Sequence, residues 1–320
     1  MAQTGGGGGV TRLRRAPAAA LVRLAAVLLA AAVVPRTAAG QDVEPRFLTP
    51  SPVGMNGAGL GYSLSTGAVL LDKTIPVENL DGDIHTVSAV FAKFFGLFGM
   101  TSRADVLVPF ATGHWTGELS GIDTVRSATG FGDPVVRAAV FFAGAPALSA
   151  RELAALDPQT VAGLSLRVRV PLGQYDNDKL INLGTNRWTF SPRLGIAHRA
   201  GRFILELYGS VWLFTDNTDF LNGNTQSQDP IVALQAHVSY RFKRGFWLAA
   251  STRQSFGGST SLNGGAETTA ESNNRLGVTL AIPFSHNVLK FAFTMPLSTA
   301  AGNDYNTFYA IWQHAWGGGL

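Results

Sequence analysis

Residues 275–284 read Arg-Leu-Gly-Val-Thr-Leu-Ala-Ile-Pro-Phe, and every second residue from Leu276 onward is a large apolar one. The residues between them include the small Gly277, Thr279 and Ala281. Successive side chains of a β-strand point to opposite faces of the sheet, so this spacing predicts a strand with one apolar and one small-residue face. The stretch decides the fold class because the same alternation recurs along the chain.

The chain contains twelve stretches of this kind. The predicted strands span residues 57–66, 84–95, 100–112, 132–142, 160–172, 187–199, 202–214, 229–242, 246–256, 273–284, 288–298 and 304–316. Most are 10–13 residues long, whereas strands average about 5–6 residues in soluble proteins. A tilted strand needs about 9–11 residues to cross a bilayer, so the lengths favour a membrane barrel over a soluble sandwich.

The connections between the predicted strands alternate between tight and long. Tight turns are predicted at residues 96–99, 200–201, 243–245 and 285–287, and long polar loops at 67–83, 113–131, 173–186, 215–228 and 257–272. Outer-membrane barrels show this asymmetry, with short periplasmic turns and longer external loops. Backbone groups in hydrocarbon must all be paired, so we expect the last strand to pair with the first and close the sheet.

One long connection falls on the side of the tight turns. It contains Ser-Ala-Arg-Glu at residues 149–152, a sequence typical of a helix capping box, followed by Asp157 and Pro158, which would end a helix. We therefore predict a short periplasmic helix over residues 149–156. The expected fold class is all-β: a transmembrane antiparallel β-barrel of about 12 strands with one short periplasmic helix. Trp188, Trp247 and Trp316 stand at strand ends, as aromatic girdles would.

Residues 1–40 have the order of a secretory signal peptide. Arginines at positions 12, 14 and 15 precede an apolar run at residues 24–34, and small residues at 38–40 precede Gln41. Eleven apolar residues are fewer than the about 20 that a membrane-spanning helix needs. We therefore expect residues 1–40 to be cleaved off and residues 41–320 to form a barrel in the outer membrane of a Gram-negative bacterium.

Composition limits the possible chemistry. The 320 residues include no cysteine, which excludes disulfides, thiolate metal sites and cysteine nucleophiles. Five of the 25 basic residues lie in residues 1–40, and the remaining 20 face 21 acidic residues, so the charge gives no reason to expect a nucleic-acid partner. The six histidines have no metal-binding spacing, and no hydrolase or nucleotide-binding motif occurs. We expect no metal, no cofactor and no enzyme activity.

The face opposite the apolar one would line the lumen. Its polar members are candidate solute contacts: Arg103, Arg137, Arg167, Arg169, Arg193, Glu206, Gln235, His237 and Arg253, with Asp105 and Arg275 beside them. An arginine that faced lipid at the bilayer midplane would cost about 2–4 kcal/mol. Two interpretations stay open: a basic conduit for anionic or electron-rich aromatic solutes, or a network of arginines and acids that fills the lumen.

Several motifs resemble those of the bacterial family called MetA-pathway of phenol degradation. They stand at residues 51–56 (SPVGMN), 130–134 (GFGDP), 171–176 (PLGQYD), 180–188 (LINLGTNRW), 212–217 (WLFTDN) and 228–230 (QDP). The resemblance spans nearly all of the chain after the leader. It implies an outer-membrane protein that is tied by name to the uptake of aromatic compounds.

The loop between the fifth and sixth predicted strands is rich in Asp, Asn and Gly. It could constrict the pore or bind solute at its mouth, with these candidate contacts: Tyr175, Asp176, Asn182, Asn186 and Arg187. The alternative is a turn system in which Asn182 and Asn186 cap their own backbone.

The expected function is passive diffusion of small aromatic or hydrophobic molecules through an outer-membrane barrel. The expected partners are outer-membrane lipid, the barrel-assembly machinery and a small-molecule solute. One alternative is a structural or adhesive outer-membrane barrel with a plugged lumen, which would have no continuous path. A third reading, an outer-membrane enzyme, would need a cluster of polar side chains at one rim.

Overall fold

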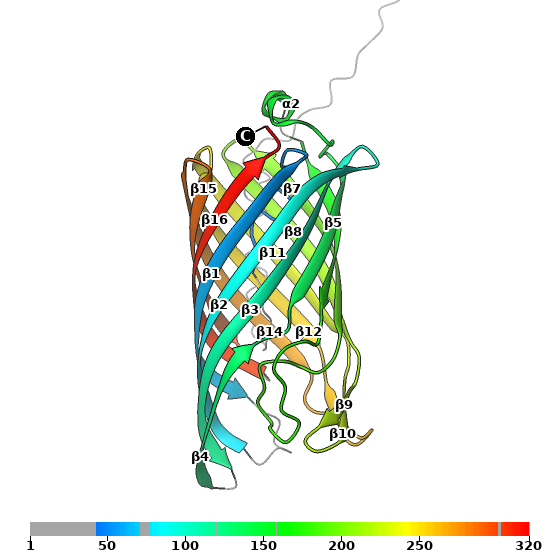
Figure 1. Ribbon diagram of the computed structural model, residues 1–320, viewed down its shortest axis with the longest axis vertical. Helices are drawn as coiled ribbons and strands as arrows, with labels where there is room; N and C mark the ends of the chain where they lie inside the picture. The colour runs from blue at the N-terminus through cyan, green and yellow to red at the C-terminus, as the bar shows by residue number, and fades with distance from the viewer. Residues whose placement is uncertain (1–42, 71–76, 120, 158, 300–301, 320) are drawn as a thin grey trace, which may run out of the picture.

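The computed structural model describes residues 43–70, 77–119, 121–157, 159–299 and 302–319. They form a tall antiparallel β-barrel whose strands run obliquely around the long axis (Figure 1). The leader predicted at residues 1–40 lies outside the described residues.

Twelve strands form the wall, and each pairs antiparallel with its neighbours. They are β1 (Met55–Leu70), β2 (Val77–Leu97), β3 (Met100–Leu119), β5 (Val135–Ala143), β6 (Val161–Arg169), β7 (Thr189–Ala200), β8 (Phe203–Phe214), β11 (Ile231–Lys243), β12 (Phe246–Gly257), β14 (Glu271–Phe284), β15 (Asn287–Ser298) and β16 (Gly302–Gly317). The pairing of β1 with β16 closes the barrel, with Met55 opposite Gly317. All twelve predicted strands and the predicted closure are confirmed.

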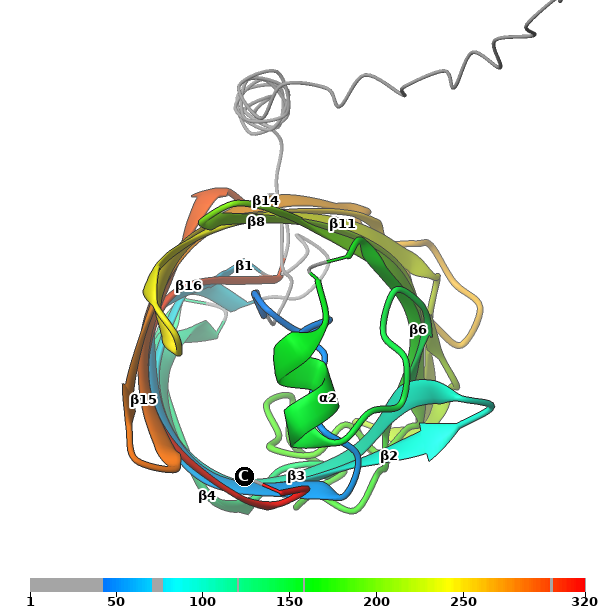
Figure 2. The ribbon, with the colours of Figure 1, turned by 90° about the horizontal axis from the view of Figure 1, so that it is seen from above.

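The tight hairpins gather at one end of the barrel, called the turn end below. Phe98 and Gly99, which join β2 to β3, have φ angles of 51° and 73°, as a two-residue hairpin turn requires. The predicted helix is confirmed at the same end as α2 (Ala150–Ala155), with both hydrogen bonds of the capping box on Ser149 and Glu152. Figure 2, viewed along the axis, shows α2 across the opening of the barrel. Among the described residues, no helix is long and apolar enough to cross a membrane.

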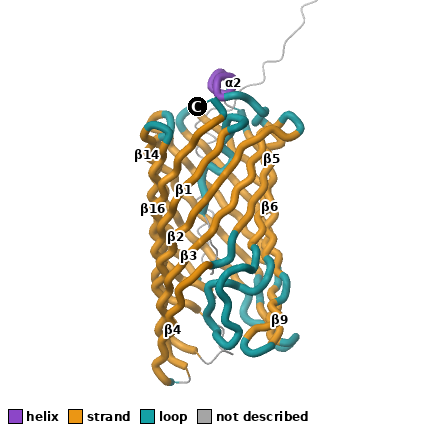
Figure 3. Tube along the Cα trace, viewed as in Figure 1, coloured by secondary structure: helices purple, strands orange, loops and turns teal. Residues whose placement is uncertain are grey.

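The opposite end, called the loop end, differs from the prediction. Strands β1, β2 and β3 continue far into the predicted loops at 67–83 and 113–131, and β4 (Ile122–Phe131) pairs with the outer half of β3. The Gly and Asp residues there are atypical of strands, but pairing between neighbouring strands satisfies their backbone groups. A small sheet of β9 (Asn217–Phe220), β10 (Asn224–Gln228) and β13 (Thr260–Leu262) lies outside the wall. Figure 3 shows the irregular loops gathered at this end.

β4 and β5 are two halves of one strand that is interrupted at residues 132–134. Phe131 pairs with Phe110 and Val135 with Leu107, so the register along β3 shifts by one residue across the break. Pro134 has no backbone N–H to donate, which favours an interruption at this point. The break separates β5, which pairs with β3 toward the turn end, from β4, which pairs with the extension of β3 at the loop end.

The two faces of the wall have the expected chemistry. Outward residues such as Leu164, Leu194 and Leu234 are 53–56% exposed, as a lipid-facing surface requires. Inward residues such as Glu206 and Arg253 are 2% and 3% exposed. Mid-strand charge is therefore kept from the apolar face, because a charge facing lipid is costly.

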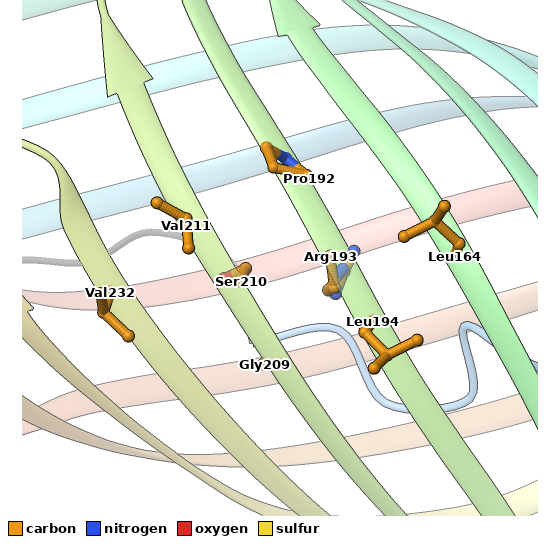
Figure 4. A pocket seen from close by; sticks show the side chains of 8 residues that line it. All are labelled: Leu164, Pro192, Arg193, Leu194, Gly209, Ser210, Val211 and Val232. Carbon is orange, nitrogen blue, oxygen red and sulfur yellow. The ribbon is translucent and has the colours of Figure 1, made fainter.

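The outer face has a shallow apolar depression of about 330 Å³ on β6, β7, β8 and β11. Figure 4 shows Leu164, Leu194, Val211 and Val232 around it. Pro192 and Gly209 account for the depression. Gly209 has no side chain, and the pairing of β7 with β8 is interrupted at Pro192, between Phe190 and Arg193. The depression faces lipid, so the candidate solute contacts have to be sought on the other side of the wall.

Candidate functional site

The lumen is occupied by the chain that precedes β1. Residues 43–50, called the N-terminal segment below, lie inside the ring of strands, where Figure 2 shows the blue start of the chain. The backbone turns at residues 45–48, and Arg46 takes a φ of 68°. Phe47 and Leu48 are 3% and 2% exposed. The sequence did not predict this segment, because it is short and has no strand or helix periodicity.

Glu44 of the segment meets the predicted lumen arginines. Its carboxylate accepts hydrogen bonds from Nη1 and Nη2 of Arg137, at 2.5 and 3.3 Å, and lies 3.6 Å from Nη2 of Arg193. Arg137 also donates to the carboxylate of Asp105 at 2.9 Å. Arg103 forms an ion pair with Asp105 as well, at 2.9 Å. We call Arg103, Arg137 and Arg193 the arginine cluster. Charge-assisted and bidentate contacts of this kind are the strong ones in proteins.

The ring of Phe47 lies among the same three guanidinium groups. Their central carbons stand 4.4 Å (Arg137), 4.6 Å (Arg193) and 5.3 Å (Arg103) from the ring centroid. The rings of Phe141 and Tyr208 meet Phe47 edge to face, at 6.2 and 6.4 Å. A cation within about 6 Å of an aromatic ring is attracted by its quadrupole. The cluster therefore binds a ring and a carboxylate at the same time.

The backbone of the segment is fixed by a second group of wall residues. Glu206 accepts a hydrogen bond from the backbone N–H of Arg46 at 2.7 Å and from the hydroxyl of Tyr208 at 2.6 Å. The same hydroxyl accepts from the backbone N–H of Leu48 at 3.4 Å. Leu48 packs where β6 has a glycine: a Cβ on Gly163 would lie 2.5 Å from Leu48 Cδ2. These contacts hold the segment independently of Glu44 and Phe47.

The other predicted lumen residues lie in separate groups. Arg167 and Arg253 stand over the ring of Trp212, at 5.5 and 5.6 Å. His237 shares a 2.8 Å hydrogen bond with Ser251 and meets Tyr208 edge to face at 5.5 Å. The remaining three predicted residues are in the wall as follows: Gln235 is buried opposite Arg253, Arg169 is half-buried opposite Thr189, and Arg275 donates to the backbone carbonyl of Tyr305. The structure thus brings Arg103, Arg137, Arg193 and Glu206 together around the segment.

Several aromatic residues of the lumen were missed. Trp247 was predicted in an interface girdle, but it is 6% exposed inside the barrel, with the guanidinium of Arg46 5.5 Å from its ring. Trp188 and Trp316 are 43% and 40% exposed, as a girdle requires. Tyr208 and Trp212 follow Glu206 by two and six residues on β8, so they share its face of the strand. That parity is the signal that would have placed them in the lumen.

The loop between β6 and β7 is built around Asp133, from the interruption between β4 and β5. Asp133 accepts hydrogen bonds from the backbone N–H of Gly173 at 2.9 Å, and from the N–H and hydroxyl of Thr185 at 2.9 and 2.7 Å. The backbone N–H of Gln174 donates to Phe131 at 2.7 Å. These contacts hold the loop along the edge of β4.

The predicted contacts of this loop take mostly structural positions. Asn182 caps the loop's own backbone, since it accepts from the N–H of Asp176 at 2.9 Å and donates to the carbonyl groups of Asp176 and Lys179. Asn186 instead donates to the side chain of Asn217 at 2.9 Å, and Tyr175 accepts from Asn217 at 2.8 Å. A hydrogen bond with Asp178 raises the pKa of Asp176.

Arg187 ends this loop beside the wall. It donates to Gln228, and its guanidinium lies 4.7 Å from the ring of Phe214. Among the residues that the structure describes, no group of three His, Cys, Asp or Glu could hold a metal ion.

Two solved structures share the fold of this chain. The COG4313 outer membrane channel from Pseudomonas putida F1 is 20% identical, with a TM-score of 0.73 over 86% of this chain and 100% of that one. The beta domain of the Bordetella autotransporter BrkA is 12% identical, with a TM-score of 0.50 over 82% of this chain and 100% of that one. At these identities the likeness concerns the fold. Among curated proteins, none matches this chain.

The family resemblance drawn from the motifs is confirmed. Residues 71–312 match the model of the family described as MetA-pathway of phenol degradation. That range covers most of the chain and includes five of the six motifs, of which those at 130–134, 171–176, 180–188 and 212–217 meet in the contacts around Asp133 and Asn217. The protein is therefore a member of the MetA-pathway of phenol degradation family.

Proposed function

We propose that this protein is a passive channel for small aromatic or hydrophobic molecules in the outer membrane of a Gram-negative bacterium. The observation that carries the proposal is the lining of the lumen, where guanidinium groups lie over aromatic rings. Arg167 and Arg253 lie over the ring of Trp212, and all three arginines of the arginine cluster lie over the ring of Phe47. Such surfaces attract flat, electron-rich rings by cation–π contact.

Three further features support the proposal. The family is tied by name to phenol degradation, and the Pseudomonas putida protein with the same fold is titled an outer membrane channel. The leader at residues 1–40 would bring the chain to the periplasm before cleavage. The barrel-assembly machinery would then insert it, and lipid would cover its apolar face. The proposed role is transport without catalysis, so it assigns no catalytic residue.

The N-terminal segment bears directly on this function. It occupies the arginine cluster, so a solute has to pass beside it or displace it. The same observation favours a second candidate, a structural or adhesive barrel whose lumen is permanently plugged. The two candidates differ in whether any solute crosses the folded protein.

The test is solute flux through the purified protein in liposomes. We would compare phenol, benzoate and a neutral sugar of similar size, for the natural chain and for Glu44→Gln/Phe47→Ala. A channel for aromatics passes phenol or benzoate faster than the sugar, and the variant passes them faster than the natural chain does. Folded, inserted protein that passes no solute in either form would support the plugged barrel and overturn the channel.

A matched control makes the same two substitutions, Glu to Gln and Phe to Ala, at positions outside the lumen. Glu267 lies in an exposed loop, and Phe98 is 91% exposed in the β2–β3 turn. The variant Glu267→Gln/Phe98→Ala should show the flux of the natural chain. Equal gains in both double variants would mean that the change is unrelated to the N-terminal segment.

A further inference from the structure

We propose that the arginine cluster is a binding site for small aromatic carboxylates, and that Glu44 and Phe47 occupy it as an internal substitute for such a ligand. The inference rests on the proposed channel function, because a solute reaches the cluster only through the lumen. It names the class of solute that this channel would hold: a molecule with a carboxylate and an aromatic ring.

The charges of the cluster require an anion. Three guanidinium groups stand together, with side chains only 10–16% exposed, and the wall residue Asp105 pairs with two of them, Arg103 and Arg137. Glu44 supplies the second carboxylate. Without it, the cluster has two positive charges in excess of Asp105, and charges that are withdrawn from water are costly unless they are paired. A site vacated by Glu44 therefore favours an anionic replacement.

The geometry requires a ring next to that anion. Arg137 holds the carboxylate of Glu44 through two nitrogens, and its central carbon lies 4.4 Å from the Phe47 ring. Arg193 likewise meets both groups, at 3.6 Å from the carboxylate and 4.6 Å from the ring centroid. The left-handed turn at Arg46 brings these two side chains, three residues apart, to the same arginines. An aromatic acid carries both groups in one molecule.

The segment would compete with such a ligand. A group tethered to its own binding site has a high effective concentration, on the order of mM for short flexible connections. In the natural chain, an aromatic carboxylate from solution must overcome the competition of the tethered Glu44 and Phe47. In Glu44→Gln/Phe47→Ala the competing groups are gone, while the contacts of Arg46 with Glu206 and of Leu48 with Tyr208 still hold the backbone. The variant thus empties the site without removing the segment.

The experiment is calorimetric titration of the purified, folded protein in detergent. The probes are benzoate, benzamide, which lacks the charge, and cyclohexanecarboxylate, which lacks the aromatic ring. We expect benzoate to bind Glu44→Gln/Phe47→Ala at least tenfold more tightly than the natural chain, and at least tenfold more tightly than either analogue. Arg193→Ala in the same background should weaken benzoate binding at least tenfold. Glu267→Gln/Phe98→Ala should match the natural chain.

Two results would overturn the inference. One is equal benzoate affinity in the natural chain and the double variant; the other is a double variant that binds benzamide or cyclohexanecarboxylate as tightly as benzoate. If the double variant fails to fold, Glu44→Gln alone keeps the packing of Phe47 and should still gain benzoate affinity several-fold. Binding is measured without flux, so the two proposals fail separately. Phenol flux without benzoate binding would refute this inference alone, and benzoate binding without any flux would refute the channel alone.

Discussion

Asp133 and Thr185 stand 52 residues apart in the chain, yet one carboxylate oxygen of Asp133 accepts both the backbone N–H and the hydroxyl of Thr185, at 2.9 and 2.7 Å. The other oxygen accepts the backbone N–H of Gly173 at 2.9 Å. These three residues belong to three of the separate motifs on which the family resemblance was drawn, at residues 130–134, 171–176 and 180–188. The motifs are therefore explained by a shared structural task, which is to fix the β6–β7 loop against the edge of β4.

Replacing Asp133 with alanine should release this loop while the barrel stays folded. The change leaves the backbone N–H groups of Gly173 and Thr185 without their acceptor, and a fully buried donor without a partner costs about 1–3 kcal/mol. We expect trypsin to cut the purified protein after Lys179, within the loop, at least tenfold faster than it cuts the natural chain. Asp123→Ala, an exposed aspartate on β4, is the matched control. Equal cleavage rates in the two variants would show that Asp133 does not hold the loop.

The period-two pattern was enough to predict the twelve strands, because a strand with one lipid face leaves its alternation in the sequence. β4 was not predictable in this way. Residues 122–131 carry Asp123, Thr124, Arg126 and Ser127 among their apolar residues, so they show no regular alternation of apolar and polar positions. Pairing with β3 stabilises it instead. Local pattern thus fails where partner strands, rather than lipid, determine the structure.

The candidate site was predictable in part, for a related reason. Parity placed Arg103, Arg137 and Arg193 on the inner face, since strand geometry alone decides which way a side chain points. Their partner Glu44 precedes Arg137 by 93 residues and lies in no predicted element. Closure of the barrel brings the segment to the arginines. No local feature of the sequence encodes that contact.

The absence of a side chain at Gly163 should be necessary for Leu48 to pack against β6. A Cβ at this position would lie 2.5 Å from Leu48 Cδ2 and 3.2 Å from Phe141 Cδ1, so Gly163→Val has to displace the leucine. We expect the N-terminal segment to loosen and the single-channel conductance in planar bilayers to rise. Gly209→Val is the control, because its Cβ would face outward at an ordinary 3.7 Å from Leu234. The prediction is wrong if Gly163→Val conducts no more than Gly209→Val.

Tyr208→Phe should loosen the same segment by another route. The change keeps the ring against Phe47 but removes the hydroxyl that donates to Glu206 at 2.6 Å and accepts from Leu48 N–H at 3.4 Å. The bond that the segment loses is the one from Leu48 N–H, and an ordinary hydrogen bond contributes about 0.5–1.5 kcal/mol, where 1.4 kcal/mol corresponds to about a tenfold change in an equilibrium constant. Amide hydrogen exchange in residues 46–49 should therefore speed up by about two- to tenfold.

The control for this change is Tyr240→Phe, whose hydroxyl meets only Arg202, at 3.4 Å, among the hydrogen bonds assigned to the described residues. It should leave exchange in residues 46–49 unchanged. Exchange that is equally slow in both variants would mean that the hydroxyl of Tyr208 does not hold the segment.

Acid should unwind α2 at the turn end. The hydroxyl and the backbone N–H of Ser149 donate to Glu152 at 2.7 and 2.9 Å and lower the pKa of Glu152 below its ordinary 4.5. A carboxylate whose pKa is lower in the folded state stabilises that state at pH values above its unfolded-state pKa. This stabilisation is lost as the pH falls through the folded-state pKa.

The chain has no cysteine, so Ala154→Cys offers a single site for a nitroxide spin label. Its mobility should stay constant from neutral pH to about pH 5 and rise below about pH 4. With Glu152→Gln in the same background, mobility should not change in that window, because glutamine does not titrate. An identical rise in both proteins would assign the transition to another group.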